Sequence, residues 1–271
     1  METFITFPNL CKLDGIAHLF TTKLGGVSEG MFATMNLSFS RGDDPEKVMQ
    51  NYALVAEALS EQSGRRFTVD DIVTSDQTHT TNVRVVTRKD CGCGLTKERT
   101  YQDVDGLITN EKGVVLSTFY ADCVPLYFVD PVCGAIGLSH SGWRGTAGRM
   151  GEVTVRKMVE HYGCKPEHMY AVVGPCICQD CYEVSEDVAL AFGETFHQDA
   201  QVLSRIMYQT KPEKYQLDLK EANRQILLDA GLPAGHIYVS GHCTCCESDY
   251  LFSHRATNGK RGNLGAFLAL I

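Results

Sequence analysis

Short hydrophobic runs, separated by turn residues, fill the middle third of the chain. Runs of this kind are typical of strands. The strands predicted in this region are 82–87, 106–109, 114–119, 124–129 and 135–139. Similar runs predict strands at 16–22, 169–173 and 237–240, and the chain ends in an apolar stretch at 264–271.

A different periodicity marks the helices. The clearest one begins after Asp44, which is a suitable N-cap, with Pro45 at the first helical position. Apolar residues then recur at helical spacing as far as Leu59. A second helix is predicted over 146–161, with Gly163 as its C-terminal stop.

Strands and helices alternate in the last third of the chain. Ser185 is predicted to cap a helix with an acidic first turn, where negative charge is favourable. Asp218 with Glu221 predicts the start of another helix, which ends near 230 before a glycine. The mixture predicts an α/β fold with a mixed sheet. No linker divides the chain, so 1–271 is expected to be one domain.

Charge and composition exclude several classes of protein. The formal charge is −8, from 25 basic against 33 acidic residues, and such a field repels nucleic-acid phosphates. No run of about 18 apolar residues suggests a membrane span. The N-terminus lacks the pattern of a secretory signal. Twelve cysteines without such a signal suggest reduced thiols or metal ligands, so we expect a cytoplasmic protein.

Three segments end an apolar run with a side chain able to bind a metal: His79, Cys123 and His140. Two imidazoles and one thiolate suit Zn²⁺, with bonds of about 2.0–2.3 Å. Three protein ligands leave the fourth position open for water or substrate, as catalytic zinc sites do. Spacing alone also allows hydrogen-bonded structural histidines and a small buried cysteine.

The turn after His140 has features of an anion site. Trp143 and Arg144 lie just before a predicted helix, where free backbone N–H groups and the helix dipole favour a phosphate. The guanidinium of Arg144 would add charge-assisted hydrogen bonds. The alternative is that Trp143 packs in the core and Arg144 pairs with a surface carboxylate.

Seven motifs follow one another along nearly the whole chain. They are 20–28 (FTTKLGGVS), 77–79 (QTH), 121–125 (ADCVP), 140–146 (HSGWRGT), 174–175 (GP), 181–184 (CYEV) and 243–246 (CTCC). In this order they resemble the YfiH-like family, whose members have been described as polyphenol oxidases or laccases and also as purine nucleoside phosphorylases.

The resemblance implies a fold, a cofactor and an activity. The fold would be a four-layer α/β/β/α sandwich with mixed sheets, and the metal Zn²⁺, bound by His79, Cys123 and His140. These three residues would also be the catalytic ones. The substrates would be phosphate and adenosine, inosine, guanosine or S-methyl-5'-thioadenosine, and adenosine deaminase activity can accompany phosphorolysis. The resemblance leaves a homodimer open.

Substrate contacts are assigned partly from these motifs and partly from charge. The candidates are Lys23, Gln77, Asp122, Arg144, Arg255 and Arg261. Two positions depart from the family pattern, because Lys23 and Ala256 replace arginines. Lysine holds phosphate as a point charge without the two-pronged geometry of arginine. Asp122 is also consistent with an ordinary strand-end cap, and Arg255 with Arg261 is also consistent with a solvated basic loop.

The remaining cysteines include two groups of three. These are Cys176, Cys178 and Cys181, followed by Cys243, Cys245 and Cys246. If the groups met, they would supply six thiols. Neither group as a whole has the paired C-x₂-C spacing that marks a zinc site, so buried reduced thiols are favoured over a second structural metal.

Two other functions remain as alternatives. A metal-free cysteine hydrolase would use Cys123 as nucleophile, with His140 or His79 as base. Copper-dependent phenol oxidation would fit the older family label. Multicopper oxidases use many imidazoles, often in H-x-H pairs, whereas this chain has nine histidines and no such pair.

Overall fold

The computed structural model describes residues 2–271, which contain three sheets. The strands are β1 Phe4–Ile5, β2 Ile16–Thr21, β3 Ile72–Thr74, β4 Val83–Val85, β5 Gly106–Thr109, β6 Val115–Tyr120, β7 Val124–Asp130, β8 Ala135–Ser141, β9 Tyr170–Val173, β10 Glu183–Ser185, β11 Met207–Lys211, β12 Lys214–Leu217, β13 Ile237–Val239 and β14 Leu264–Leu270.

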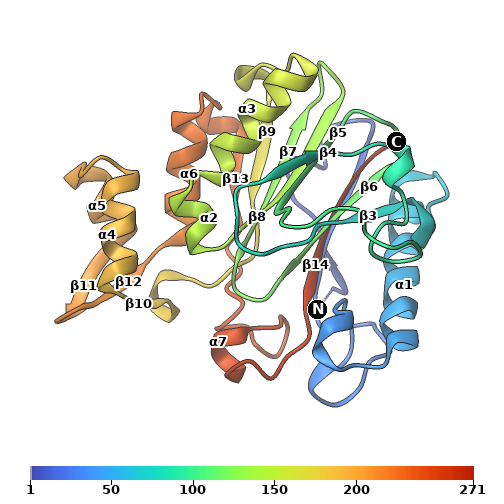
Figure 1. Cartoon of the computed structure of the whole chain (residues 1–271), viewed down its shortest axis with the longest axis horizontal. Helices are drawn as coiled ribbons and strands as arrows, with labels where there is room; N and C mark the ends of the chain where they lie inside the picture. Colours follow the sequence, from blue (N-terminus) through green and yellow to red (C-terminus); the bar gives the residue numbers. More distant parts are fainter. Residues whose placement is uncertain (1) are drawn as a thin grey trace.

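Two mixed sheets lie at the centre of the molecule (Figure 1). The first has the order β1-β2-β14-β6-β3, in which only the β3–β6 pair is parallel. The second has the order β13-β9-β7-β8-β5-β4, with parallel pairs at both edges. A small antiparallel sheet, β10-β12-β11, stands apart at the side of the molecule.

The α-helices flank these sheets. They are α1 Pro45–Ser63, α2 Trp143–Ala147, α3 Met150–Tyr162, α4 Glu186–Thr195, α5 Ala200–Ile206, α6 Leu219–Asp229 and α7 His254–Thr257. Asp44 caps α1, because its carboxylate accepts a hydrogen bond from the Glu46 N–H. Asp218 caps α6 in the same way through the N–H of Glu221.

Three clusters of buried side chains fill the spaces between these elements. One contains Val55 and Leu59 of α1 together with Leu19 of the five-stranded sheet. A second contains residues of both central sheets, such as Leu116 and Leu138. The third joins the six-stranded sheet to α3, α4 and α6. The predicted mixed α/β class is confirmed.

One predicted helix is wrong in its extent. The stretch 146–161 was expected to be continuous, but α2 ends at Ala147 and α3 begins at Met150. Arg149 adopts a left-handed conformation with φ of 57° and forms ion pairs with Glu152 and Asp229. These pairs compensate for the break, so tertiary contacts override the local helical pattern.

Three connections between the two central sheets meet at one end of the molecule. The loop 75–82 joins β3 to β4, the turn 121–123 joins β6 to β7, and the segment 240–263 joins β13 to β14. The strand directions place all three connections at the same end. The His79 and Cys123 segments are therefore neighbours in space, although they are far apart in sequence.

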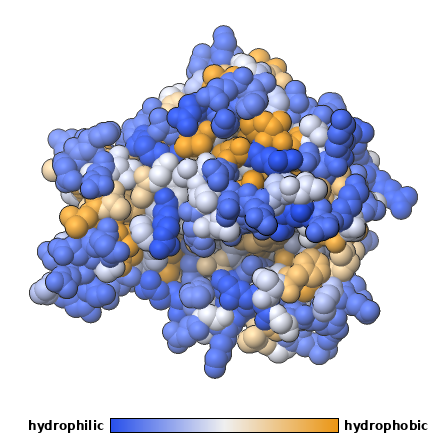
Figure 2. All heavy atoms as spheres, viewed as in Figure 1, coloured by the Kyte–Doolittle hydropathy of each residue, from blue (hydrophilic) through white to orange (hydrophobic). Residues whose placement is uncertain are grey.

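The helices and one face of the surface bear on whether the chain crosses a membrane and on how its apolar residues are distributed. Within residues 2–271, no helix combines the length and the apolar character needed to cross a bilayer. Figure 2 shows a largely hydrophilic face, on which apolar residues gather in separate patches rather than in one continuous band.

Candidate active site

The three predicted metal ligands come together. One donor atom each from His79, Cys123 and His140 can be chosen so that all lie within 4.8 Å of one another. The rings of His79 and His140 are edge-on, with centroids 5.0 Å apart. His140 is on β8 opposite Pro125 of β7, directly beside the turn that carries Cys123. His79 is exposed and has a positive φ of 67°, which is uncommon for a residue other than glycine.

Asp105, which no sequence motif marks, holds both histidines in place. This fully buried carboxylate lies 2.8 Å from Nδ1 of His140 and accepts the backbone N–H of His79 at 3.1 Å. It also accepts the backbone N–H groups of Thr78 and Thr80. Because the Nδ1–H of His140 donates to Asp105, its Nε2 is free to face Cys123.

The same contacts change the ionisation of the site. Burial alone raises the pKa of Cys123, but the charge of His140 and hydrogen bonds from both histidines lower that pKa to about 6. Burial lowers the pKa of His140, whereas Cys123 and Asp105 raise it to about 9. Burial opposes ionisation of Asp105, but the hydrogen bond from His140 keeps its pKa below the usual value. The chain thus favours a thiolate, the form in which cysteine binds metals or attacks carbon.

His79, Cys123 and His140 line a cleft of about 760 Å³, which is within the usual range of about 300–1,000 Å³ for small-molecule sites. Four arginines line the cleft, against two aspartates, Asp76 and Asp122. The arginines are Arg41, Arg99, Arg255 and Arg261. The cleft is therefore locally positive in a chain with a formal charge of −8, which suits an anionic substrate.

Arg261 is the most unusual of these arginines. Its side chain is only 8% exposed, and its Nε has no hydrogen-bond partner among the described residues. One terminal nitrogen donates to the Gly262 carbonyl at 3.2 Å and to the Asn263 side chain. Burial, followed by the nearby Arg41, lowers the pKa of Arg261 to about 10. Arg261 also lines the cleft, where the charge of its guanidinium is suited to hold an oxyanion.

Two other predicted substrate-binding residues line the cleft, but their side chains already form hydrogen bonds within the protein. The side-chain amide of Gln77 bonds to both the carbonyl and the N–H of Phe119, at 2.8 and 2.6 Å. Asp122 accepts from the Thr244 hydroxyl at 2.6 Å and from the Arg255 backbone N–H at 2.7 Å. Both residues tie neighbouring segments to the cleft wall.

Arg255 forms part of that wall. Its guanidinium lies over the ring of Tyr182 at 5.3 Å and donates to the Cys181 and Glu183 carbonyls. Both Arg255 and Tyr182 line the cleft. Tyr182 belongs to the CYEV motif. Its contact with Arg255, which is 73 residues later in the chain, could not be predicted from that motif.

Lys23 and Arg144 are not among the residues that line the cleft. The ammonium of Lys23 donates to the Ser248 carbonyl at 2.9 Å and lies 5.4 Å from the ring centre of Phe252. Arg144 is exposed and stacks on the neighbouring Trp143 at 4.4 Å. Trp143 packs partly buried against the helical core, as the alternative interpretation expected.

The structure also brings together part of the other two cysteine groups. Cys178, Cys181, Cys243 and Cys246 form a second cluster, whose sulfur atoms all lie within 4.8 Å of one another. The expected absence of paired C-x₂-C spacing does not hold for these four residues. Each side supplies a C-x₂-C pair, which the sequence hides inside a larger group of three.

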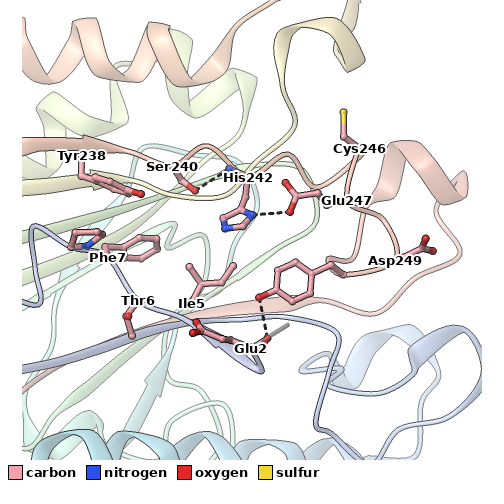
Figure 3. Close-up of a pocket in the computed structure, with 12 residues that line it drawn as sticks. Glu2, Ile5, Thr6, Phe7, Tyr238, Ser240, His242, Cys246, Glu247 and Asp249 are labelled. Carbon is pink, nitrogen blue, oxygen red and sulfur yellow. Dashed lines mark hydrogen bonds and ion pairs between the residues drawn. The ribbon is translucent and has the colours of Figure 1, made fainter.

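A second pocket, of about 580 Å³, contains none of the predicted site residues. Figure 3 shows its polar side, where Nδ1 of His242 lies 2.7 Å from a carboxylate oxygen of Glu247. Tyr250 and Tyr238 contribute to its lining. The predicted site residues that line a pocket therefore all lie in the arginine-rich cleft.

The donor set of the cleft fits a divalent zinc ion. With bonds of about 2.0–2.3 Å, the ligand atoms of a tetrahedral site lie about 3.3–3.8 Å apart, within the spacing found here. A thiolate, two imidazoles and a buried carboxylate behind one imidazole form a familiar zinc environment. The fold and site define a mixed α/β protein with three candidate ligands for one metal, set in a positively charged cleft.

Comparison with known proteins assigns the family. The family model described as multi-copper polyphenol oxidoreductase laccase matches residues 17–271, so the chain belongs to this family. The purine nucleoside phosphorylase YlmD of Geobacillus stearothermophilus is 41% identical over 249 residues, covering 92% of this chain and 88% of the relative. The adenosine deaminase RL5, from an unknown prokaryotic organism, is 33% identical and covers 90% of each chain.

The fold comparison agrees with the sequence comparison. The crystal structure of the Bacillus licheniformis hypothetical protein YfiH matches with a TM-score of 0.87 and 35% identity, covering 94% of this chain and 93% of that one. The resemblance to the YfiH-like family is confirmed.

Proposed function

We propose that this chain is a zinc-dependent purine nucleoside phosphorylase that also deaminates adenosine. The observation that carries the proposal is the meeting of His79, Cys123 and His140 in a cleft lined by four arginines. The names of two relatives, a purine nucleoside phosphorylase and an adenosine deaminase, support the same pair of reactions. Adenosine, inosine, guanosine and S-methyl-5'-thioadenosine are the proposed substrates.

The residues of the cleft divide between binding and positioning. His79, Cys123 and His140 would hold Zn²⁺, which, as a Lewis acid, would stabilise charge on the purine or activate water for deamination. Arg261, with its unpaired Nε, and the nearby Arg41 would hold phosphate for attack on the anomeric carbon. Asp105 fixes the orientation of His140 and would leave its Nε2 free to act as a zinc ligand.

Release of free base tests the proposal directly. Zinc-loaded protein given inosine should produce hypoxanthine only when phosphate is present, while ammonia release from adenosine should not need phosphate. Cys123→Ala should abolish both reactions. Cys11→Ala, which changes an exposed cysteine outside the cleft, is the matched control. No base release from protein that retains its zinc would overturn the proposal.

A metal-free cysteine hydrolase is the second candidate. The specific observation in its favour is the series Asp105, His140 and Cys123, in which a buried carboxylate orients an imidazole beside a thiolate. Thiol alkylation separates the two functions. If Cys123 is a zinc ligand, stoichiometric zinc should slow its reaction with iodoacetamide, and a chelator should restore the rate. A reaction that zinc does not change would favour the hydrolase.

Copper-dependent phenol oxidation has less support, although the family description names copper. Among residues 2–271, only one of the metal-capable groups contains histidine, and it contains two. Elemental analysis distinguishes the metals, because the phosphorylase should contain zinc and a multicopper oxidase should contain several coppers. The cytoplasm remains the proposed location, since all twelve cysteines are free thiols.

A further inference from the structure

The cluster of Cys178, Cys181, Cys243 and Cys246 lies outside the cleft and is not used by the proposed reaction. Cys181 Sγ and Cys246 Sγ are 3.4 Å apart, and Cys178 Sγ and Cys246 Sγ are 3.8 Å apart. These separations are close to the spacing of about 3.7–3.8 Å expected for sulfurs around one tetrahedral ion with bonds of about 2.3 Å. All four cysteines are free thiols.

The backbone around Cys243 is arranged to stabilise a thiolate. The N–H of Cys246, three residues later, points to Cys243 Sγ at 3.4 Å. The N–H of Cys178, from the other loop, points to the same sulfur at 3.2 Å. Two backbone N–H donors to one sulfur lower the energy of its anionic form, which is the form that binds metal.

We infer that these four cysteines form a structural zinc site. Two C-x₂-C pairs supply four thiolates, which complete a tetrahedral shell and leave no position for a substrate. Cys176 and Cys245 lie outside this set. Figure 3 supports the assignment, because the Cys246 sulfur points away from the polar side chains of the second pocket.

The site joins two segments that form a wall of the catalytic cleft. Cys181 immediately precedes Tyr182, and its carbonyl accepts a hydrogen bond from the Arg255 guanidinium at 3.3 Å. On the other side, Thr244 lies between Cys243 and Cys246 and donates to Asp122 at 2.6 Å. A metal at the cluster would hold both segments together, and so fix the position of Tyr182 and Arg255.

A disulfide explains the arrangement less well. Two disulfides could also use all four sulfurs, but Cys246 Sγ lies close to both Cys178 Sγ and Cys181 Sγ, as expected for sulfurs around one ion rather than in separate pairs. The close pair Cys133 and Cys164 offers a useful contrast. The neighbouring carboxylate of Asp130 is already bonded to the N–H groups of Val132, Cys133 and Lys165, so that site lacks a comparable donor set.

Metal analysis of the full chain tests the inference. Protein purified with reduced thiols should contain about two zinc ions per chain, and Cys178→Ser/Cys246→Ser should contain about one. The matched control, Cys133→Ser/Cys164→Ser, should keep the wild-type content. An unchanged zinc content in Cys178→Ser/Cys246→Ser would overturn the inference, as would a disulfide among these four cysteines in protein purified with reduced thiols and zinc present.

A second measurement does not depend on the folding of the cysteine variant. His79→Ala/His140→Ala removes two ligands of the cleft site and leaves all four thiols of the cluster. Loaded with cobalt, this variant should show the intense thiolate-to-cobalt charge-transfer bands and visible bands of a tetrahedral four-sulfur site. Absence of these bands in folded protein would overturn the inference even if the cleft site binds zinc as proposed.

Discussion

The two clusters of metal-capable side chains differ in composition, support and surroundings. The cleft cluster has two imidazoles and one thiolate, with the buried carboxylate of Asp105 behind it. The cysteine cluster has four thiols, and backbone N–H groups support Cys243. Three donors in a positively charged cleft leave a coordination position for a substrate, whereas four donors outside the cleft leave none. Donor number therefore separates a proposed catalytic role from a structural one.

The largest expected difference between the clusters is in turnover. His140→Ala should lower kcat for base release by about 10³ or more, because losing several kcal/mol of metal-ion stabilisation has an effect of that order. Cys246→Ser should lower kcat by about tenfold or less, since the cysteine cluster only positions the wall. Steady-state rates at saturating phosphate measure both values. Equal losses in the two variants would contradict the division of roles.

The second difference is in thermal stability. Losing a zinc ion present at about a thousand times its dissociation constant removes about 4 kcal/mol of stabilisation. For a chain of this size, Cys178→Ser/Cys246→Ser should then lower Tm by roughly 10 °C. Calorimetry in a zinc buffer measures the change, with Cys133→Ser/Cys164→Ser as the control. An unchanged Tm for the first variant would contradict a structural role.

A smaller effect, on zinc affinity, is expected from changing Asp105, the carboxylate that contacts His140. Asp105→Asn removes the negative charge that orients His140, so zinc affinity should fall by about 10–100-fold. Competition with a chromophoric chelator measures it. Asp103→Asn is the matched control, because Asp103 accepts from Thr78 on the same loop but contacts neither histidine. Similar losses in both variants would show a general effect on the loop, not support of the ligand.

The smallest effect is expected on phosphate binding, when one of the arginines that line the cleft is changed. Arg261→Gln should raise the KM for phosphate by about tenfold, as expected for losing about 1.4 kcal/mol of binding, with a smaller change in kcat. Arg156→Gln, on the exposed side of α3, is the control and should leave KM unchanged. A fall in kcat with constant KM would place Arg261 in the chemical step instead.

Local patterns predicted much of the fold. Asp44 and Pro45 marked the start of α1, and the apolar runs marked β5, β7 and β8 closely. These elements obey local rules of capping and hydrophobic burial. The break between α2 and α3 was not predictable, because it depends on the pairing of Arg149 with Asp229, 80 residues further along.

In the candidate active site, too, local patterns marked some residues, whereas contacts between distant parts of the sequence could not be predicted. The motifs singled out His79, Cys123 and His140, and these residues do come together. Asp105 was missed because its partners lie 25 to 35 residues away, so no local pattern marks it. The unpaired Nε of Arg261 is also visible only after folding.

Gly142, the N-cap of α2, has a consequence for the spacing of two candidate metal ligands. Its φ of −72° is open to any residue, so an alanine would meet no backbone strain. A Cβ at this position would lie 3.0 Å from Cys123 Sγ and 3.0 Å from His79 Cδ2. The methyl group would press these two side chains outward. Residue 142 must therefore lack a side chain if Cys123 and His79 are to keep their present positions.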